Sequence, residues 1–312
     1  MNLHLSVITP TYNEKDSILH CINRLRQVME QNCPGIEYEH IIIDNCSSDR
    51  TAEIAIEASK GDSRIKVVVN SRNIGASRSI YRALSRVSGK WIIPMLPADL
   101  QDPPEVIPLM LDRAIDGVEV VYGIRTNRKE RLLIRSLRKI YYRVLKKYSP
   151  FNLQNDAGEF MLVSSRVIDS ITAIRDQNPY VRGLVAQTGA KFASIPYQWN
   201  ERESGKSKSS VFVLADVAVS GMVSTTYIPA RISLVFGFTI SFLGVLAGVV
   251  YLILAMLSSK DVPAGIPTLT IAIFLLGGFQ LFFLGLIGEY VISIHRQIKP
   301  ETDVTSMKES NF

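Results

Sequence analysis

The segment from Pro97 to Glu105 carries the side chains with the clearest capacity for chemistry. It reads Pro-Ala-Asp-Leu-Gln-Asp-Pro-Pro-Glu and follows a short apolar run at 91–96. A carboxylate such as Asp99, with a second oxygen ligand nearby, can hold a divalent cation and leave coordination positions for a diphosphate. Because open α/β sheets bind ligands at the carboxyl ends of their strands, this segment predicts a metal–diphosphate site at a sheet edge.

The elements that must position this segment are predicted from apolar runs and helical spacing. Apolar runs predict strands at 5–9, 39–44, 65–69, 91–96 and 118–123, and helical spacing predicts helices at 16–31, 51–60, 76–87 and 104–116. Further strands are expected at 155–163 and 192–197, with a helix at 180–189. Strand–helix alternation favours an α/β fold with a parallel sheet and helices on both faces.

Polar loops follow the first three predicted strands, at Thr9–Glu14, Asp44–Asp49 and Asn70–Ala76. The carboxyl ends of parallel strands meet at one edge of a sheet. An acid at such an edge can accept hydrogen bonds from a base N–H or from ribose hydroxyls, and Gly75 permits close approach of the backbone. Together the loops predict a nucleotide site beside the metal segment.

The bulk composition limits the partners. The chain has 312 residues, a net charge of +6 and a pI near 9.2. Such a balance suits nucleic acid, an anionic bilayer or an anionic substrate. No nucleic-acid motif is present and no aromatics are interleaved with the basic runs, so we exclude nucleic acid. The three cysteines lack CxxC spacing, which argues against a zinc site or a disulfide scaffold and fits a reducing compartment. No cleaved signal peptide is expected.

Long apolar segments near the C-terminus predict a membrane hairpin. Residues 232–257 and 265–288 contain no charged side chain, and at about 1.5 Å per residue each is long enough for the roughly 30 Å hydrocarbon core. Arg231 precedes them, and basic side chains at 295–299 follow. The positive-inside rule therefore predicts that both termini and the first domain are cytoplasmic.

Two further segments are predicted to lie in the membrane interface. Residues 131–148 form an apolar stripe flanked by Lys and Arg, which suits an anionic interface, with a core-packed surface helix as the alternative. Residues 211–230 form a second apolar helix. The predicted organisation is a catalytic domain at 1–210 that includes 131–148, an interfacial helix at 211–230, two transmembrane helices within 231–292 (about 232–257 and 266–288), and a cytoplasmic tail at 293–312. This describes a multi-pass protein of the inner (plasma) membrane.

The chain resembles glycosyltransferase family 2, whose members have the GT-A (Rossmann-like) nucleotide-sugar-binding fold. More narrowly, it is similar to the polyprenyl-phosphate glycosyltransferases of the dolichol-phosphate-mannose-synthase-like branch. The matching segments span nearly the whole chain and are Pro-Thr-Tyr-Asn-Glu at 10–14, Asp-Asn-Cys-Ser-Ser-Asp at 44–49, Arg-Asn-Ile-Gly at 72–75, Ala-Asp-Leu-Gln-Asp-Pro-Pro-Glu at 98–105, Asp-Ala-Gly-Glu-Phe at 156–160, Val-Arg-Gly-Leu at 181–184, Arg-Glu-Ser-Gly-Lys-Ser-Lys at 202–208 and Gly-Glu-Tyr at 288–290. The sequence departs from the family at Pro97, where an Asp is frequent, and at Asn45 and Cys46, where Asp and Gly are usual.

The resemblance implies roles for the matching residues. The residues implied to surround the nucleotide sugar are Pro10, Tyr12, Glu14, Asp44, Asn73, Gly75 and Asp99. Those implied to hold Mg²⁺ or Mn²⁺ are Asp99 and Gln101. Those implied to contact the acceptor phosphate are Arg182, Arg202, Ser207 and Lys208. Asp156 is the implied catalytic carboxylate, together with Asp99, Arg202 and Lys208. Because a phosphate monoester is already largely dianionic at neutral pH, an orienting role for Asp156 stays open.

These features predict an enzyme that transfers a sugar, with inversion, from a nucleotide sugar to a polyprenyl phosphate at the cytoplasmic membrane face. Cleavage at the sugar C1 builds positive character on the ring, and a divalent ion offsets the charge of the leaving diphosphate. UDP-hexose is the preferred donor, and GDP-mannose is the alternative. The competing hypotheses are a processive polysaccharide synthase, which would need a Gln-x-x-Arg-Trp motif and more spans, and a membrane-anchored, non-catalytic nucleotide-sugar-binding partner. The oligomeric state is open, with a homo-oligomer as one option.

Overall fold

The computed structural model describes residues 4–114, 117–126, 157–174, 176, 179–200, 266–298 and 305–312, together with 235–237, 239–240, 242–244, 246, 250 and 253. The chain divides into two compact units. The first contains Met1–Lys208 and Pro300–Phe312, and the second contains Ser209–Lys299. The predicted interfacial segments at 131–148 and 211–230 lie outside the described residues, so both stay predictions.

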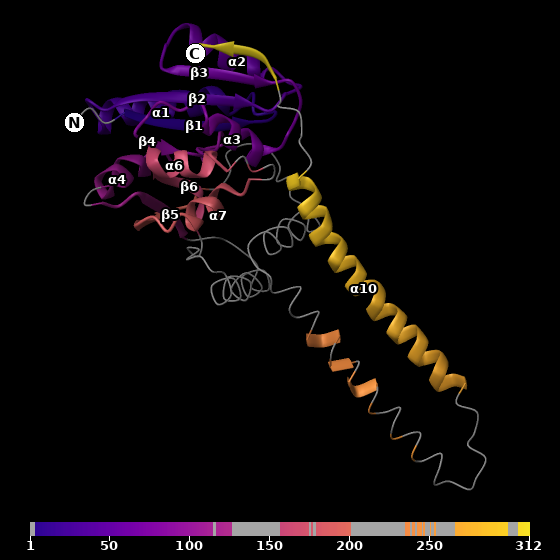
Figure 1. Ribbon diagram of the computed structural model, residues 1–312. Helices are drawn as coiled ribbons and strands as arrows, with labels where there is room; N and C mark the ends of the chain where they lie inside the picture. Colours follow the sequence, from indigo (N-terminus) through magenta and orange to yellow (C-terminus); the bar gives the residue numbers. More distant parts are fainter. Residues whose placement is uncertain are drawn as a thin grey trace. The chain divides into compact units, whose positions relative to one another are not determined.

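The first unit is built on one eight-stranded sheet with the order β7-β5-β6-β4-β1-β2-β3-β8 (Figure 1). The strands are β1 (His4–Thr11), β2 (Glu37–Asp44), β3 (Ile65–Asn70), β4 (Trp91–Ile93), β5 (Val120–Thr126), β6 (Ala157–Ser164), β7 (Phe192–Gln198) and β8 (Ser306–Ser310). The strands β1, β2, β3 and β4 are parallel, and β5 pairs in parallel with β7. In contrast, β6 is antiparallel to β4 and β5, and β8 is antiparallel to β3.

The prediction of a parallel sheet is therefore correct for β1 to β4 and wrong for β6. The strand β8 lies in the predicted tail at 293–312, where no strand was predicted. The apolar run Phe160–Val163 of β6 is buried on both faces of the sheet. Phe160 and Leu162 belong to one core cluster, and Met161 and Val163 belong to another. A strand buried on both faces has the same continuous apolar pattern in either direction, so the sequence pattern does not reveal the direction of β6.

Helices cover both faces of the sheet, as predicted (Figure 1). They are α1 (Ile18–Asn32), α2 (Thr51–Lys60), α3 (Ala76–Leu84), α4 (Val106–Arg113), α6 (Ser165–Thr172) and α7 (Val181–Gln187). On one face, α3 and α6 pack through Ile80 and Val167. On the other face, α1 and α4 pack through Leu25 and Ile107, and α2 joins α1 through Ala55. The polar loops are thereby left at the edges of the sheet.

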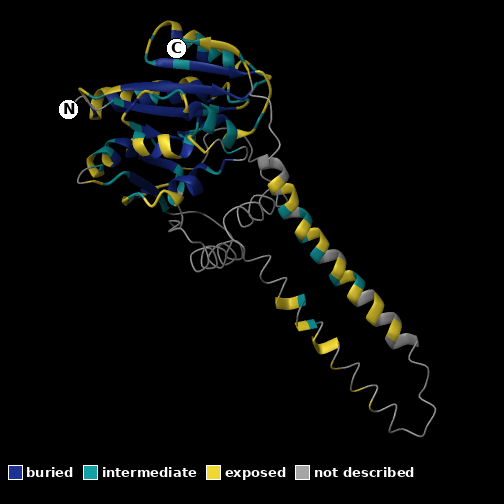
Figure 2. Ribbon diagram, viewed as in Figure 1, coloured by how far each residue is buried: buried dark blue, intermediate teal, exposed yellow. Residues whose placement is uncertain are grey.

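The second unit contains the helix α10 (Ile266–Ile298), which begins where the second membrane span is predicted. Its described side chains include large apolar residues that are more exposed than buried, among them Leu269, Leu276 and Ile287 (Figure 2). Within the described residues, no helix combines the length and the hydropathy that a membrane crossing requires. The two predicted membrane spans therefore stay predictions.

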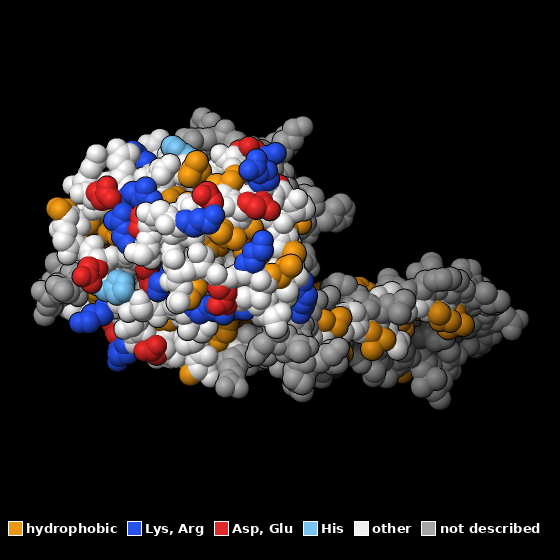
Figure 3. All heavy atoms as spheres, turned by 90° about the horizontal axis from the view of Figure 1, so that it is seen from above, with side chains coloured by type: hydrophobic (Ala, Val, Ile, Leu, Met, Phe, Trp, Pro, Cys, Tyr) orange, Lys and Arg blue, Asp and Glu red, His pale blue; other side chains and the backbone are white. Residues whose placement is uncertain are grey.

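The surface of the first unit mixes charges of both signs. Figure 3 shows Lys and Arg side chains interspersed with Asp and Glu on the face that is seen from above. Surface ion pairs of the unit include Arg24 with Glu105 at 2.5 Å and Lys60 with Glu57 at 2.6 Å. The net charge of +6 therefore does not form a single basic patch on the face shown.

Candidate active site

The carboxyl ends of β1, β2, β3 and β4 meet at one edge of the sheet, as predicted, because these strands are parallel. The loops that follow β1 and β2 are hydrogen-bonded to each other, since Asn13 N donates to Ser47 Oγ at 2.9 Å. The segment after β4 is held on β1, since Leu96 N donates to Ile8 O at 2.8 Å. The predicted nucleotide loops and the predicted metal segment are thus neighbours on one edge.

Asp44 lies beneath the nucleotide loops with a fully buried side chain. Its carboxylate accepts hydrogen bonds from Thr11 Oγ1 at 3.0 Å, from Ser47 N at 2.8 Å and from Ser47 Oγ at 2.5 Å. Asp44 therefore shapes the loop between β2 and α2, whereas the neighbouring Tyr12 is 41% exposed and presents an aromatic surface at the same edge.

Asn45 joins the loop after β2 to the loop after β3. Its Nδ2 donates to Asn73 Oδ1 at 2.8 Å, and its Oδ1 accepts from Ile74 N at 2.9 Å. Asn73 Oδ1 also accepts from Gly75 N at 2.9 Å. An amide can donate and accept at once, whereas an ionised carboxylate only accepts. Asn73 Oδ1 needs a hydrogen-bond donor opposite it, and Asn45 supplies one where the Asp that is usual in the family could not.

Three positions in the nucleotide loops have left-handed backbone, and one of them is Asn13, with φ 56°, after β1. Gly75 has φ 84° and Cys46 has φ 60°. A Cβ added at Gly75 would meet no heavy atom within 4 Å, so glycine is required by the backbone conformation and not by lack of space. Cys46 stands where the family usually has Gly, and a side chain in this conformation costs on the order of 1 kcal/mol. The loop keeps the turn although it has lost the residue that favours it.

The predicted metal segment forms a tight turn. Leu100 has φ 52°, its N donates to Pro97 O at 3.0 Å, and its side chain is buried. Gln101 N donates to Asp99 Oδ1 at 3.3 Å, and both side chains are partly exposed. A partly exposed carboxylate beside an amide oxygen fits Mg²⁺ or Mn²⁺ when diphosphate oxygens complete the ligand set. Within the described residues, no group of three or more His, Cys, Asp or Glu side chains could hold a metal ion.

Asp102, the second acid of the segment, is used differently. Arg125 on β5 donates to it from Nε at 2.9 Å and from Nη2 at 2.6 Å, and the Tyr197 hydroxyl of β7 donates at 2.5 Å. The Asp102 side chain is fully buried, and the Arg125 guanidinium stacks on the Trp199 ring at 5.4 Å. Because both carboxylate oxygens are occupied, Asp102 is a structural anchor of the metal segment and not one of its ligands.

The pKa values around this anchor follow from burial and charge. Burial alone lowers the pKa of Arg125, but its hydrogen bonds to Asp102 and the carboxylate charge outweigh burial, so the pKa lies above its ordinary value. Burial and the nearby Asp102 charge raise the pKa of Tyr197. Both groups therefore keep their protons at neutral pH, and the ion pair with its hydroxyl donor is intact.

Arg182 and Glu159 form a second polar group near the start of β6. Arg182 belongs to α7, is buried and stacks on Tyr180 at 5.5 Å. Burial raises the pKa of Glu159, and the charges of Arg182 and Arg125 oppose that rise. Sequence reasoning assigned Arg182 to the acceptor phosphate but gave no role to Glu159, although it stands in the matching motif at 156–160.

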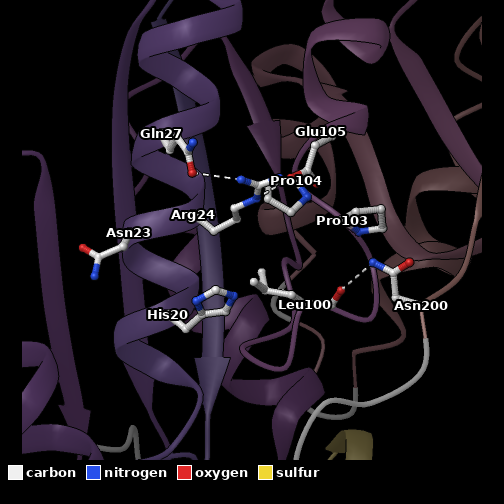
Figure 4. A pocket seen from close by; sticks show the side chains of 9 residues that line it. All are labelled: His20, Asn23, Arg24, Gln27, Leu100, Pro103, Pro104, Glu105 and Asn200. Atoms are coloured by element: carbon white, nitrogen blue, oxygen red, sulfur yellow. Dashed lines mark hydrogen bonds and ion pairs between the residues drawn. The ribbon is translucent and has the colours of Figure 1, made fainter.

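A pocket of about 490 Å³ lies beside the metal segment, between α1 and residues 100–105 (Figure 4). It is lined by His20, Asn23, Arg24, Gln27, Leu100, Pro103, Pro104, Glu105 and Asn200, and no predicted site residue is among them. Asn200 Nδ2 donates to Leu100 O at 3.5 Å, and Asn200 N donates to Gln101 O at 3.0 Å. The pocket therefore lies against the outer side of the Leu100 turn, and Asn200 fastens the end of β7 to that turn.

Several predicted residues lie outside the described part of the chain. These are Asp156, Arg202, Ser207 and Lys208. Sequence reasoning missed the anchor formed by Asp102, Arg125 and Tyr197. The sequence contains one signal that could have revealed this anchor. Arg125 follows the apolar run of a predicted strand, and an arginine that is buried there requires an acidic partner.

The chain is similar to known proteins over most of its length. Residues 6–172 match the family model described as Glycosyl transferase family 2. The chain is 28% identical to the SfII prophage-derived bactoprenol glucosyl transferase of Shigella flexneri, over 95% of this chain and 95% of that protein. It is 30% identical to the undecaprenyl-phosphate 4-deoxy-4-formamido-L-arabinose transferase of Klebsiella pneumoniae, over 95% of this chain and 90% of that protein.

The structure is similar to that of glucosyl-3-phosphoglycerate synthase from Mycobacterium tuberculosis in complex with Mn²⁺, UDP-glucose and glycerol 3-phosphate. The TM-score is 0.52 at 19% identity, over 71% of this chain and 78% of that chain. At this identity the similarity shows the fold alone, a GT-A-like α/β fold with a mixed sheet.

Proposed function

The chain belongs to glycosyl transferase family 2, and we propose that this glycosyltransferase moves a hexose from UDP-hexose to a polyprenyl phosphate with inversion. The observation that carries the proposal is the extent of the similarity to two relatives named for polyprenol carriers. It covers 95% of the chain in both cases, and so includes the apolar region after residue 208 as well as the nucleotide loops. One relative is named for a glucosyl group, a hexose, and the other for an arabinose derivative, a pentose, so the hexose of this proposal follows the first relative.

The donor site of this proposal is the edge formed by the loops after β1, β2 and β3. Tyr12 offers a ring for stacking on the base, and Gly75 lets the backbone approach the phosphates. Asp99 and Gln101 are the residues that would hold Mg²⁺ or Mn²⁺. A bound ion would offset the negative charge of the departing diphosphate. Because Pro97 stands where the family often has a second Asp, Asp99 is the partly exposed carboxylate of this turn. Removal of the Asp99 carboxylate should therefore strongly reduce sugar transfer.

The acceptor side of the proposal includes residues that follow the end of β7. Asn200 is hydrogen-bonded to the metal turn at 3.0 Å, and the next residues begin the segment that contains Arg202, Ser207 and Lys208. Cationic side chains there would neutralise the acceptor phosphate, with Arg182 contributing from α7. Asp156 would orient the acceptor or accept its proton.

The membrane arrangement is part of the same proposal. A polyprenyl chain stays in lipid because exposing each CH₂ costs about 0.8 kcal/mol, so the enzyme must act at the headgroup plane. The uncharged segments at 232–257 and 265–288 would cross the bilayer as a hairpin, with 131–148 and 211–230 in the interface. The chain leaves the first unit at Lys208 and re-enters it at Pro300, which supports an even number of crossings. The positive-inside rule would then place the catalytic unit on the cytoplasmic side.

A donor panel tests the proposal. The purified full-length protein in nanodiscs receives undecaprenyl phosphate, Mn²⁺ and radiolabelled UDP-glucose, UDP-N-acetylglucosamine or GDP-mannose. We expect label in the organic-extractable lipid with a UDP-sugar, and loss of transfer by at least about a hundredfold in Asp99→Ala with the protein still inserted in the membrane. If only GDP-mannose labels the lipid, GDP-mannose replaces UDP-hexose as the proposed donor. Donor binding without transfer to any carrier would favour a non-catalytic partner and overturn the proposal.

A further inference from the structure

The last residues of the chain complete the catalytic sheet. The strand β8 pairs in antiparallel fashion with β3, from Val67 opposite Ser310 to Asn70 opposite Ser306, with an irregularity between Val69 and Asn70. The tail therefore covers an edge of β3 whose N–H and C=O groups would otherwise lack partners. The sequence gives little signal for this strand, because Ser-Met-Lys-Glu-Ser is polar and short.

The tail is held by specific contacts beyond strand pairing. Asn311 has φ 63°, and its Nδ2 donates to Ser59 O at 2.7 Å and to Ile65 O at 2.9 Å. The Phe312 ring lies under the cations of Arg86 at 5.2 Å and Lys66 at 5.4 Å. These contacts fix the register of β8 on the sheet, because a shift by one residue would break all of them.

The other end of β8 touches the loop that follows β3. Ser71 N donates to Thr305 O at 3.0 Å. The guanidinium of Arg82 bridges the two segments, since Nη2 donates to Ser306 Oγ at 2.8 Å and Nη1 donates to Asn70 Oδ1. The tail thus contacts the first residues of the predicted nucleotide loop, both directly and through Arg82.

Asn70 connects the contacts of the tail to the rest of the loop after β3. It is fully buried, and its Nδ2 donates to Ser79 Oγ at 3.0 Å and to Asn45 Oδ1 at 3.4 Å. Asn45 in turn holds Asn73 and the backbone of Ile74. A continuous set of hydrogen bonds therefore links Ser306 to the turn at Gly75.

We infer that the C-terminal strand is a positioning element of the donor site, which sets the conformation of residues 70–75 for binding of the nucleotide diphosphate. The inference rests on the proposed function, which assigns these residues to the donor. Without β8, Arg82 loses one of its acceptors and Ser71 N loses its partner, so the loop samples other conformations. Donor affinity then falls, because binding must restore the ordered loop.

The test deletes β8 and then adds it back as a separate peptide. A shortened protein that ends at Val304, and so lacks β8, is compared with the full-length wild type. Calorimetry measures UDP binding in the presence of Mn²⁺, and hydrogen exchange is measured for residues 71–75. We expect UDP binding to weaken about tenfold, as for the loss of a hydrogen bond to a charged group, together with faster exchange. A synthetic peptide of residues 303–312 should restore both. Unchanged exchange and unchanged affinity in the shortened protein would overturn the inference.

Two point variants separate positioning from simple edge protection. Ser306→Ala removes one acceptor of Arg82, the Ser306 hydroxyl, and should weaken UDP binding about threefold. Met307→Ala changes the neighbouring, 64% exposed side chain of the same strand and should leave UDP affinity unchanged. Equal effects of the two variants would show that β8 only protects the edge. If the wild type binds neither UDP nor GDP, the proposed function fails, whereas faster exchange at 71–75 in the shortened protein still supports the positioning of this loop by β8.

Discussion

Arg125 and Asp102 form a bidentate ion pair that ties the metal turn to the far half of the sheet. The donor atoms are Nε at 2.9 Å and Nη2 at 2.6 Å from the two carboxylate oxygens. Asp102 directly follows Gln101 in the chain, and Arg125 belongs to β5, which lies on the other side of β6 and β4 from β1. The pair therefore fixes the position of Asp99 and Gln101 relative to the strands that carry the proposed acceptor side.

Asp102→Asn tests this anchor. The change keeps the size of the side chain but removes the counter-charge of a largely buried guanidinium. Breaking a buried pair on one side costs about 3–5 kcal/mol, and since the Arg125 side chain keeps 19% exposure, we expect a loss near the lower limit. Denaturant titration of the purified wild type and variant measures the free energy of unfolding of each protein. Glu119→Gln is the matched control, because its partner Arg166 is exposed on the surface and the loss of a surface pair should destabilise the protein far less. Equal losses in the two variants would contradict the anchor.

Tyr197→Phe separates positioning of the metal turn from general stability. The hydroxyl donates to Asp102 Oδ1 at 2.5 Å and accepts from Arg125 Nε at 3.3 Å. We expect the Mn²⁺ concentration for half-maximal transfer to rise about threefold, with kcat at saturating Mn²⁺ close to that of the wild type. Tyr81→Phe is the control, since this hydroxyl donates to Ile171 O at 2.9 Å, away from the metal turn. A rise of the same size in the control would refute a specific role for Tyr197.

The elements with strong periodic patterns could be predicted from the sequence, and so could the edge where the site lies. The helix α1 is an example, because Ile18, Ile22 and Leu25 repeat at helical spacing and are buried as expected. Pro94 explains why β4 ends earlier than predicted, since proline has no N–H to pair. The helix α6 was missed, because the sequence analysis assigned no element to 165–172, where α6 follows β6 directly.

The anchor and the C-terminal strand could not be predicted, for a different reason. Asp102 is separated from Tyr197 by 95 residues and from Arg125 by 23 residues, and no local pattern announces a partner at such distances. The strand β8 is polar and gains its stability from contacts with β3 and with Ser59 and Arg86. Its conformation depends on a sheet edge that the tail sequence does not encode.

Cysteine modification offers a direct probe of the nucleotide loop. Cys21 and Cys33 are buried, and burial raises the pKa of Cys21 to about 12 and also raises the pKa of Cys33. Because the thiolate is the reactive form, we expect iodoacetamide to modify the partly exposed Cys46 first. UDP with Mn²⁺ should slow that reaction, since Cys46 lies between Asn45 and Ser47 in the loop after β2. Mass spectrometry measures the site and the rate. Modification of Cys46 at the same rate with and without UDP would argue against a nucleotide at this loop.

His40 gives the sheet a defined dependence on pH. Its side chain is buried on β2, its Nε2 lies 2.8 Å from Thr9 Oγ1, and burial lowers its pKa to about 4. In the unfolded chain the pKa is about 6.5. Between these values the unfolded state binds a proton that the folded state does not, so stability falls as the pH falls from 6.5 towards 4.

The linkage predicts a loss of about 2 kcal/mol between pH 7 and pH 5 from this residue. Urea unfolding at the two pH values measures it, and His40→Gln should reduce the difference by that amount because glutamine does not titrate. The carboxylates that are ion-paired in the folded state, such as Asp62 with Arg64, lose their contribution at lower pH, because their pKa values are depressed. If His40→Gln shows the same pH dependence as the wild type, the pKa of His40 is not lowered in the folded state, and the prediction is wrong.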